Sequence, residues 1–159
     1  MGKTLVAYFS ATGTTARVAE KIAEATGGGL FEIQPATPYT SADLNWNDKR
    51  SRSTIEMNDE SRRPAISSRV DAMDAYDVVF VGFPIWWYVE PRIIDSFLEG
   101  YDFSGKTIVP FATSGGSGLG KAPQRMASIA SGARILSGKR LNASVSQSEI
   151  DSWVAGLGL

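Results

Sequence analysis

Hydroxyl side chains and a glycine are concentrated in one short stretch near the N-terminus, Ser10-Ala11-Thr12-Gly13-Thr14-Thr15. It follows an apolar run at 5–9 and precedes apolar residues at helical spacing, which predicts a turn from a buried strand into a helix. Backbone N–H groups at a helix N-terminus lack partners, and together with the helix dipole they attract anions. The stretch therefore predicts a phosphate site, although serine and threonine are also ordinary helix caps.

Three adjacent aromatic residues form a second candidate, Trp86-Trp87-Tyr88, in a loop that begins with Pro84-Ile85. The loop follows a continuous apolar strand at 78–83, and we expect its tip to have no core to fill. Aromatic side chains in such a place favour a planar ligand stacked on at least one ring. The alternative is that one tryptophan closes the end of the sheet and another is simply half exposed.

A third loop, Thr113-Ser114-Gly115-Gly116-Ser117-Gly118, follows the apolar strand at 107–112. With the glycine and lysine that come next it approaches a nucleotide-binding P-loop, but Ala122 stands where the magnesium-binding hydroxyl belongs. Ser117 resembles a hydrolase nucleophile, yet the chain has no histidine to activate it. The loop is better suited to offer backbone N–H and carbonyl groups to the polar edge of a ring.

The composition excludes several kinds of chemistry. The chain has no cysteine and no histidine, which excludes thiolate nucleophiles, disulfides, Ser–His–Asp triads and the usual zinc sites, so we expect no metal. Redox chemistry would need a bound cofactor. A net charge of −1 argues against nucleic acid or a membrane as partners, and no apolar run approaches the roughly 20 residues of a membrane span. With no signal region at the N-terminus, we expect a cytoplasmic protein.

Strand and helix patterns alternate five times along the 159 residues, which predicts one α/β domain over 1–159. Right-handed crossovers and a ligand loop after the first strand favour a doubly wound, five-stranded parallel sheet with strand order 2-1-3-4-5 and helices on both faces. Such sheets bind ligands beyond the carboxyl ends of their strands, where the three loops would converge. Pro110 is unexpected within the fourth strand, because proline cannot donate a hydrogen bond to a neighbouring strand.

Residues 36–70 are the least regular part of the chain. Ser41 could cap a helix that carries Leu44, Trp46 and Ile55, but the spacing of these apolar residues is irregular. We otherwise expect a surface segment outside the sheet.

Together these motifs resemble the flavodoxin family. Ser10-x-Thr12-Gly13-x-Thr15 is similar to the flavodoxin phosphate motif, and the loops at 84–88 and 113–117 are similar to those of short flavodoxin-like proteins. The resemblance implies FMN, with its phosphate on 10–15 and its ring between 84–88 and 113–118. The chain departs from well-known flavodoxins because it is not strongly acidic, its 36–70 segment is long and its third loop has no aromatic residue.

From the resemblance we expect an FMN-dependent electron-transfer protein that works with a separate reductase and an electron acceptor. An NAD(P)H-dependent FMN reductase of quinones or similar acceptors, and a flavin-binding sensor or scaffold without turnover, remain alternatives. Residues 84–105 contain four acids and one base, Glu90, Asp95, Glu99 and Asp102 against Arg92. This count predicts an acidic rim beside the ring, which would lower the reduction potential of the cofactor and repel a nicotinamide dinucleotide.

Overall fold

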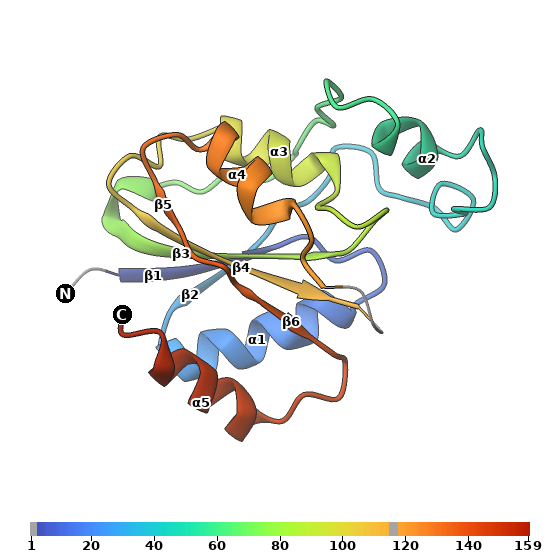
Figure 1. Ribbon diagram of the computed structural model, residues 1–159. Helices are drawn as coiled ribbons and strands as arrows, with labels where there is room; N and C mark the ends of the chain where they lie inside the picture. Colours follow the sequence, from blue (N-terminus) through green and yellow to red (C-terminus); the bar gives the residue numbers. More distant parts are fainter. Residues whose placement is uncertain (1–2, 115–117) are drawn as a thin grey trace.

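The computed structural model describes residues 3–114 and 118–159, and its centre is a parallel β-sheet (Figure 1). The strand order is β2-β1-β3-β4-β5, which confirms the predicted fold class and order. The strands are β1 (Lys3–Tyr8), β2 (Gly29–Glu32), β3 (Tyr76–Pro84), β4 (Thr107–Thr113) and β5 (Arg134–Ile135). A sixth strand, β6 (Lys139–Leu141), also pairs with β4, so the outer edge next to β4 is built from two short pieces.

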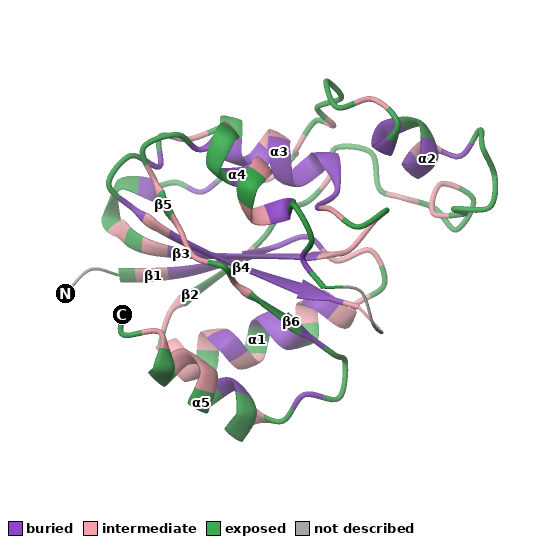
Figure 2. Ribbon diagram, viewed as in Figure 1, coloured by how far each residue is buried: buried purple, intermediate pink, exposed green. Residues whose placement is uncertain are grey.

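Helices cover both faces of the sheet (Figure 1). Helices α1 (Thr14–Thr26) and α5 (Gln147–Gly156) lie on one face, and α3 (Arg92–Glu99) and α4 (Ala122–Ile129) lie on the other. Side chains alternate between the faces along each strand, so that Val6 and Phe80 pack towards α1 and α5 while Leu5 and Val79 pack towards α3 and α4. Figure 2 shows that β1, β3 and β4 are largely buried.

Helix α1 directly follows the hydroxyl-rich turn, and its buried face is the predicted one. Its four buried residues are Thr15, Val18, Ala19 and Ile22. The helix begins after Gly13 and ends at Gly27, and both glycines adopt left-handed backbone angles, with φ of 93° and 68°. This packing fixes the direction in which the first turn of α1 points, beyond the end of β1.

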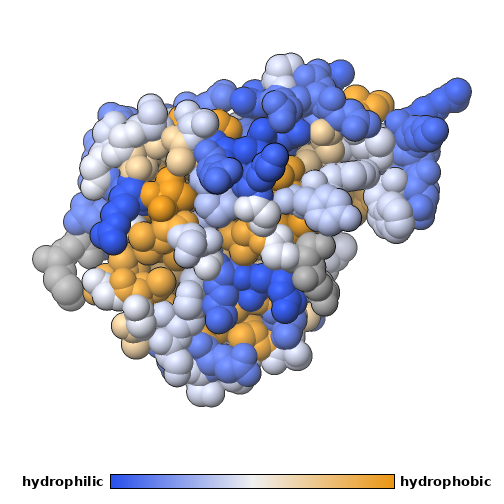
Figure 3. All heavy atoms as spheres, in the orientation of Figure 1, coloured by the Kyte–Doolittle hydropathy of each residue, from blue (hydrophilic) through white to orange (hydrophobic). Residues whose placement is uncertain are grey.

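Residues 36–70 form a segment that projects beside the sheet, with hydrophilic residues over most of its visible surface (Figures 1 and 3). Its helix, α2 (Arg52–Met57), begins at Ser51, whose hydroxyl accepts a hydrogen bond from the Thr54 N–H. The prediction that Ser41 caps a helix here is therefore wrong. Trp46 lies in the turns before α2, with 70% of its surface exposed.

Helix α3 holds this projecting segment against the rest of the protein. The buried Arg92 guanidinium donates to the carbonyl oxygens of Glu56 (3.2 Å) and Met57 (3.0 Å) in the last turn of α2. After the short 3₁₀ helix η1 (Met73–Ala75) the chain enters β3. Within the described ranges no helix is long and apolar enough to cross a membrane.

Pro110 lies in β4 where the neighbouring strand changes from β5 to β6. The carbonyl of Ile108 accepts a hydrogen bond from the Leu136 N–H. Position 110 is two residues later in the strand, so a backbone N–H there would point to the same side of β4 as the Ile108 carbonyl. Opposite it the backbone of Gly138 comes so close that an added Cβ would lie 2.2 Å from the Pro110 carbonyl oxygen. The N–H that proline lacks thus falls in the gap between two short strands, which explains why the residue is tolerated.

Candidate functional site

The three predicted loops leave the carboxyl ends of β1, β3 and β4, which are neighbours in the sheet. They meet around a pocket of 560 Å³, within the range of about 300–1,000 Å³ that is usual for small-molecule sites. The lining residues are Thr12, Thr14, Pro84, Thr113, Ser114, Asn142, Ala143 and Ser144. The last three, which follow β6, were not predicted.

Ser10 closes the turn before α1. Its hydroxyl oxygen accepts hydrogen bonds from the backbone N–H groups of Gly13 (3.0 Å) and Ala16 (3.2 Å). Gly13 makes the close turn possible, since its φ of 93° is strained for any residue with a side chain. Ser10 therefore fixes the shape of the turn and does not line the 560 Å³ pocket.

The first turn of α1 presents donors at the pocket. Among the described residues, the N–H groups of Thr14 and Thr15 have no hydrogen-bond acceptor, and no acidic residue lies in this turn. Thr12 and Thr14 line the pocket. Unpaired N–H groups at the positive end of a helix dipole, surrounded by hydroxyl side chains, suit a phosphate group. The residues present therefore fit the phosphate of FMN.

The side chain of Thr15, also predicted at the phosphate, makes a contact within the protein. Its hydroxyl lies 2.7 Å from that of Thr113, and both residues are buried. This contact joins the phosphate turn to the end of β4, so it holds two of the three loops in register. The backbone N–H of Thr15 remains available to a ligand.

The aromatic loop turns sharply between Trp86 and Val89, which exchange two backbone hydrogen bonds of 3.0 and 3.2 Å. The two residues at the tip, Trp87 and Tyr88, both have positive φ, 49° and 71°. This is the pattern of a type I′ turn, which normally takes asparagine or glycine. Left-handed geometry costs roughly 1–2 kcal/mol for each bulky residue, and such strain is concentrated at functional sites.

The three aromatic residues separate into two roles. Trp86 packs edge-to-face on Phe9 (5.7 Å between ring centroids) and on Tyr39 (5.3 Å), so it closes the end of the sheet. Ile85 packs against the same core. Trp87 and Tyr88 are 41% and 73% exposed, and they remain the candidates for contact with a planar ligand.

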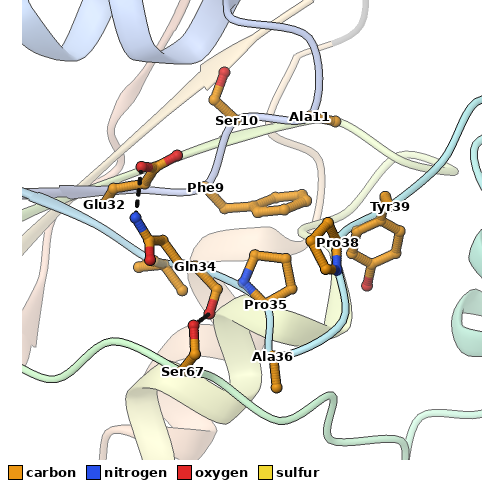
Figure 4. Close-up of a pocket in the computed structure, with 11 residues that line it drawn as sticks. Phe9, Ser10, Ala11, Glu32, Gln34, Pro35, Ala36, Pro38, Tyr39 and Ser67 are labelled. Carbon is orange, nitrogen blue, oxygen red and sulfur yellow. Dashed lines mark hydrogen bonds between the residues drawn. The ribbon is translucent and has the colours of Figure 1, made fainter.

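A second pocket, of 380 Å³, lies on the other side of the phosphate turn (Figure 4). Ser10 and Ala11 line this pocket and not the larger one, together with Phe9 and the chain that follows β2. Tyr39 forms one wall and is held on two sides, because its hydroxyl donates to the Glu56 carboxylate (2.5 Å) and the Arg52 guanidinium lies 3.9 Å from its ring centroid. Burial and the bond to Glu56 raise the pKa of Tyr39.

The third loop is described only in part, and the predicted ligands Gly115, Gly116 and Ser117 lie outside the described residues. After them, Gly120 has a φ of 56°, and an added Cβ would lie 2.5 Å from the Tyr88 carbonyl oxygen. The third loop thus lies directly against the aromatic turn. Arg140, which was also not predicted, donates to the Ser114 carbonyl (3.2 Å) and brings an exposed cation beside the pocket.

The predicted acidic rim is wrong. Glu90 and Asp95 are fully buried, and each accepts a hydrogen bond of 3.2 Å from Arg125. Glu99 forms an ion pair of 2.8 Å with Arg63. Counting charges along 84–105 missed these arginines, which come from other parts of the chain. Of the four acids only Asp102 makes no ion pair with a described residue, and hydrogen bonds from Ser104 lower its pKa.

Comparison with known proteins agrees with this geometry. A candidate flavoprotein from Bacteroides eggerthii is 51% identical, with all of this chain and 99% of that one covered and a TM-score of 0.94. A second from Bacteroides uniformis is 50% identical over 97% of this chain and 98% of that one, with a TM-score of 0.92. A comparison with curated protein sequences found no match.

More distant structures share the fold. A flavoprotein from Lactobacillus acidophilus, solved in complex with FMN, is 24% identical over 97% of this chain and 99% of that one, with a TM-score of 0.72. The sequence model of the flavodoxin family matches residues 3–157, which include all three loops around the pocket. Family and fold together support FMN as the cofactor expected from the sequence. This chain belongs to the flavodoxin family.

Proposed function

We propose that this protein binds FMN at the 560 Å³ pocket and transfers electrons between a separate reductase and an acceptor protein. The observation that carries the proposal is the first turn of α1, whose free N–H groups face a pocket lined by hydroxyl groups. Thr12 and Thr14, with the N–H groups of Thr14 and Thr15, would hold the phosphate. No lysine or arginine lies in the turn itself, so neutral donors and the helix dipole would provide the attraction.

FMN when bound supplies reversible one- and two-electron chemistry that no side chain of this protein can perform. The ring would lie between the aromatic turn and the third loop. Pro84, Thr113 and Ser114 line the pocket on this side, and Trp87 and Tyr88 are exposed at the tip of the loop that begins with Pro84. An exposed, rigid aromatic edge beside the cofactor favours contact with a partner protein, which supports the role of electron carrier.

A direct NAD(P)H-dependent reductase of quinones or similar acceptors is the second candidate. With Glu90 and Asp95 buried and paired, the expected repulsion of a dinucleotide phosphate is lost. The exposed Arg140 guanidinium beside Ser114 would instead attract such an anion. This observation keeps the reductase as an alternative to the carrier.

Titration of flavins into the FMN-free protein, followed by tryptophan fluorescence, tests the binding site. FMN should bind more tightly than riboflavin, because riboflavin lacks the phosphate. Thr14→Glu should abolish FMN binding by like-charge repulsion, whereas Ser128→Glu, at an exposed position on α4, should leave it unchanged. Equal affinity for FMN and riboflavin would refute the phosphate assignment.

NADPH oxidation by the purified FMN-loaded protein then separates the two roles. For a carrier we expect slow oxidation with a quinone as acceptor and fast reduction by an added flavin reductase. Rapid turnover by the protein alone would favour the reductase. In that case Arg140→Gln should raise the KM for NADPH more than it lowers kcat, since it removes a charge that binds the dinucleotide.

A further inference from the structure

A group of buried charges lies behind the aromatic turn, away from the pocket lining. Glu90 directly follows the turn, Asp95 is in the first turn of α3 and Arg125 is in α4. Both carboxylates are inaccessible to solvent. One guanidinium contacts both of them, with Arg125 Nε 3.2 Å from Glu90 Oε2 and Arg125 Nη2 3.2 Å from Asp95 Oδ2. Since a single guanidinium spans them, the two acids lie close together.

Each acid keeps one oxygen without a donor. Glu90 Oε1 and Asp95 Oδ1 are buried, and neither has a hydrogen-bond partner among the described residues. An ionised carboxylate in a buried place needs donors on both oxygens, and leaving an acceptor unpaired is costly. If one of the two acids carries a proton on its unpaired oxygen, the resulting O–H group can donate a hydrogen bond to the unpaired oxygen of the other acid. Both oxygens then have a partner.

The surrounding cations do not supply that donor. Arg125 also contacts Glu60 of the projecting segment at 3.0 Å. Arg92 Nη1 is buried and lies 3.7 Å from Asp95 Oδ2, too far for a hydrogen bond, and it has no hydrogen-bond partner among the described residues. The other Arg92 donors go to the carbonyl oxygens of α2. Arg63 reaches the same Oδ2 of Asp95 only at 4.0 Å and is closer to Glu99. Every cation that faces the pair from α3, α4 and the projecting segment thus approaches an oxygen other than the two unpaired ones.

We propose that Glu90 and Asp95 share one proton at neutral pH, and that this proton holds the aromatic turn against α3 beside the cofactor pocket. The second part rests on the proposed function, because it concerns the loop expected to contact FMN. Glu90 follows the aromatic turn directly, and Asp95 is in α3. Arg125 comes from α4, which follows the third loop, so the pair and Arg125 together join the anchors of both ring-side loops. Arg125 is the positioning residue that brings the two acids together.

The titration of the pair agrees with this geometry. Burial, the hydrogen bond with Asp95 and the negative charge of Asp95 raise the pKa of Glu90 to about 9. The folded protein therefore binds this proton more tightly than the unfolded chain does. Stability that depends on the proton is fully present below the ordinary pKa of glutamate, near 4.5, and is lost as the pH rises through about 9.

Infrared spectroscopy of the FMN-free protein tests the proton directly. At pH 7 we expect the carbonyl band of a buried protonated carboxyl group, which is lost above about pH 9 and is absent from Glu90→Gln. Glu99→Gln, at the half-exposed end of α3, should keep the band. A wild-type protein without this band at pH 7 would overturn the proposal, whether or not the protein binds FMN.

Thermal unfolding over a pH range gives a second measurement. The midpoint of the wild type should fall as the pH rises from 6 towards 9.5, whereas that of Glu90→Gln should be much less dependent on pH. The affinity for FMN should follow the same pattern, with a larger loss at pH 9.5 in the wild type than in Glu90→Gln. If the wild type and Glu90→Gln lose stability equally as the pH rises, the shared proton does not exist. If their stabilities differ but their FMN affinities fall equally with pH, the proton is unrelated to the cofactor.

Discussion

Replacing Gly120 by alanine tests whether the third loop and the aromatic turn form one unit. Two separate costs can be worked out from the structure. The φ of 56° is strained for alanine, at roughly 1–2 kcal/mol. The new Cβ would also lie 2.5 Å from the Tyr88 carbonyl oxygen, so the turn must move away, and overpacking of this kind costs about 1–3 kcal/mol.

The sum predicts that Gly120→Ala lowers the free energy of unfolding by roughly 2–5 kcal/mol. For a chain of this length, this loss corresponds to a fall of roughly 4–20 °C in the midpoint of thermal unfolding. The affinity for FMN should fall as well, because the displaced carbonyl belongs to the turn beside the pocket. Thermal and urea unfolding, each with and without FMN, measure both effects.

Two other glycines separate the two costs. Gly118→Ala has an ordinary φ and no atom within 4 Å of the new Cβ, so it should change stability by less than about 0.5 kcal/mol. Gly13→Ala has a φ of 93° and equally open space, so its loss of stability should reflect the strained backbone alone. If Gly120→Ala costs no more than Gly13→Ala, the close approach to Tyr88 carries no energy and the reasoning fails.

Three further predictions concern the aromatic residues and the cofactor. Trp86→Ala should lower the free energy of unfolding by roughly 2–4 kcal/mol in urea, because it removes the ring that packs on Phe9 and Tyr39, whereas Trp87→Ala should cost less than about 0.5 kcal/mol. FMN should quench tryptophan emission less in Trp87→Ala than in Trp46→Ala. Trp46 is exposed on the projecting segment and serves as the control. Equal quenching in the two variants would mean that Trp87 does not contact the ring. FMN at a hundredfold excess over its Kd should stabilise the protein by about 2.7 kcal/mol. Binding should also give new hydrogen-exchange protection at 84–91 and 118–121, and protection confined to β2 would contradict the site.

The sheet and the phosphate turn could be predicted because their evidence is local. The continuous apolar run of β3 identifies a central strand, and the change from strand to hydroxyl-rich turn to helix within 5–22 identifies the turn at the start of α1. Alternation of strands and helices then restricts the order of the strands to very few possibilities. Each of these inferences needs only residues that are close together in the sequence.

The rest of the site depends on contacts over long sequence distances. Arg125 pairs with acids 30 and 35 residues away, so a count of charges over 84–105 could not detect it. Asn142 and its neighbours enter the pocket because β6 carries them there, and a strand of three residues has no recognisable periodicity. Trp86 and Trp87 are identical by type, and only the positive φ of Trp87 decides which is exposed.

The break between β5 and β6 affects how this protein meets other chains. A long, regular edge strand presents a row of unpaired N–H and carbonyl groups that can recruit a strand from another molecule and begin aggregation. Here the outer edge next to β4 consists of a two-residue and a three-residue strand, with Lys139 and Arg140 exposed on the second. Neither piece is long enough to guide a foreign strand, and the two charges repel further copies. Pro110, which requires the break, therefore helps to keep concentrated protein from joining edge to edge.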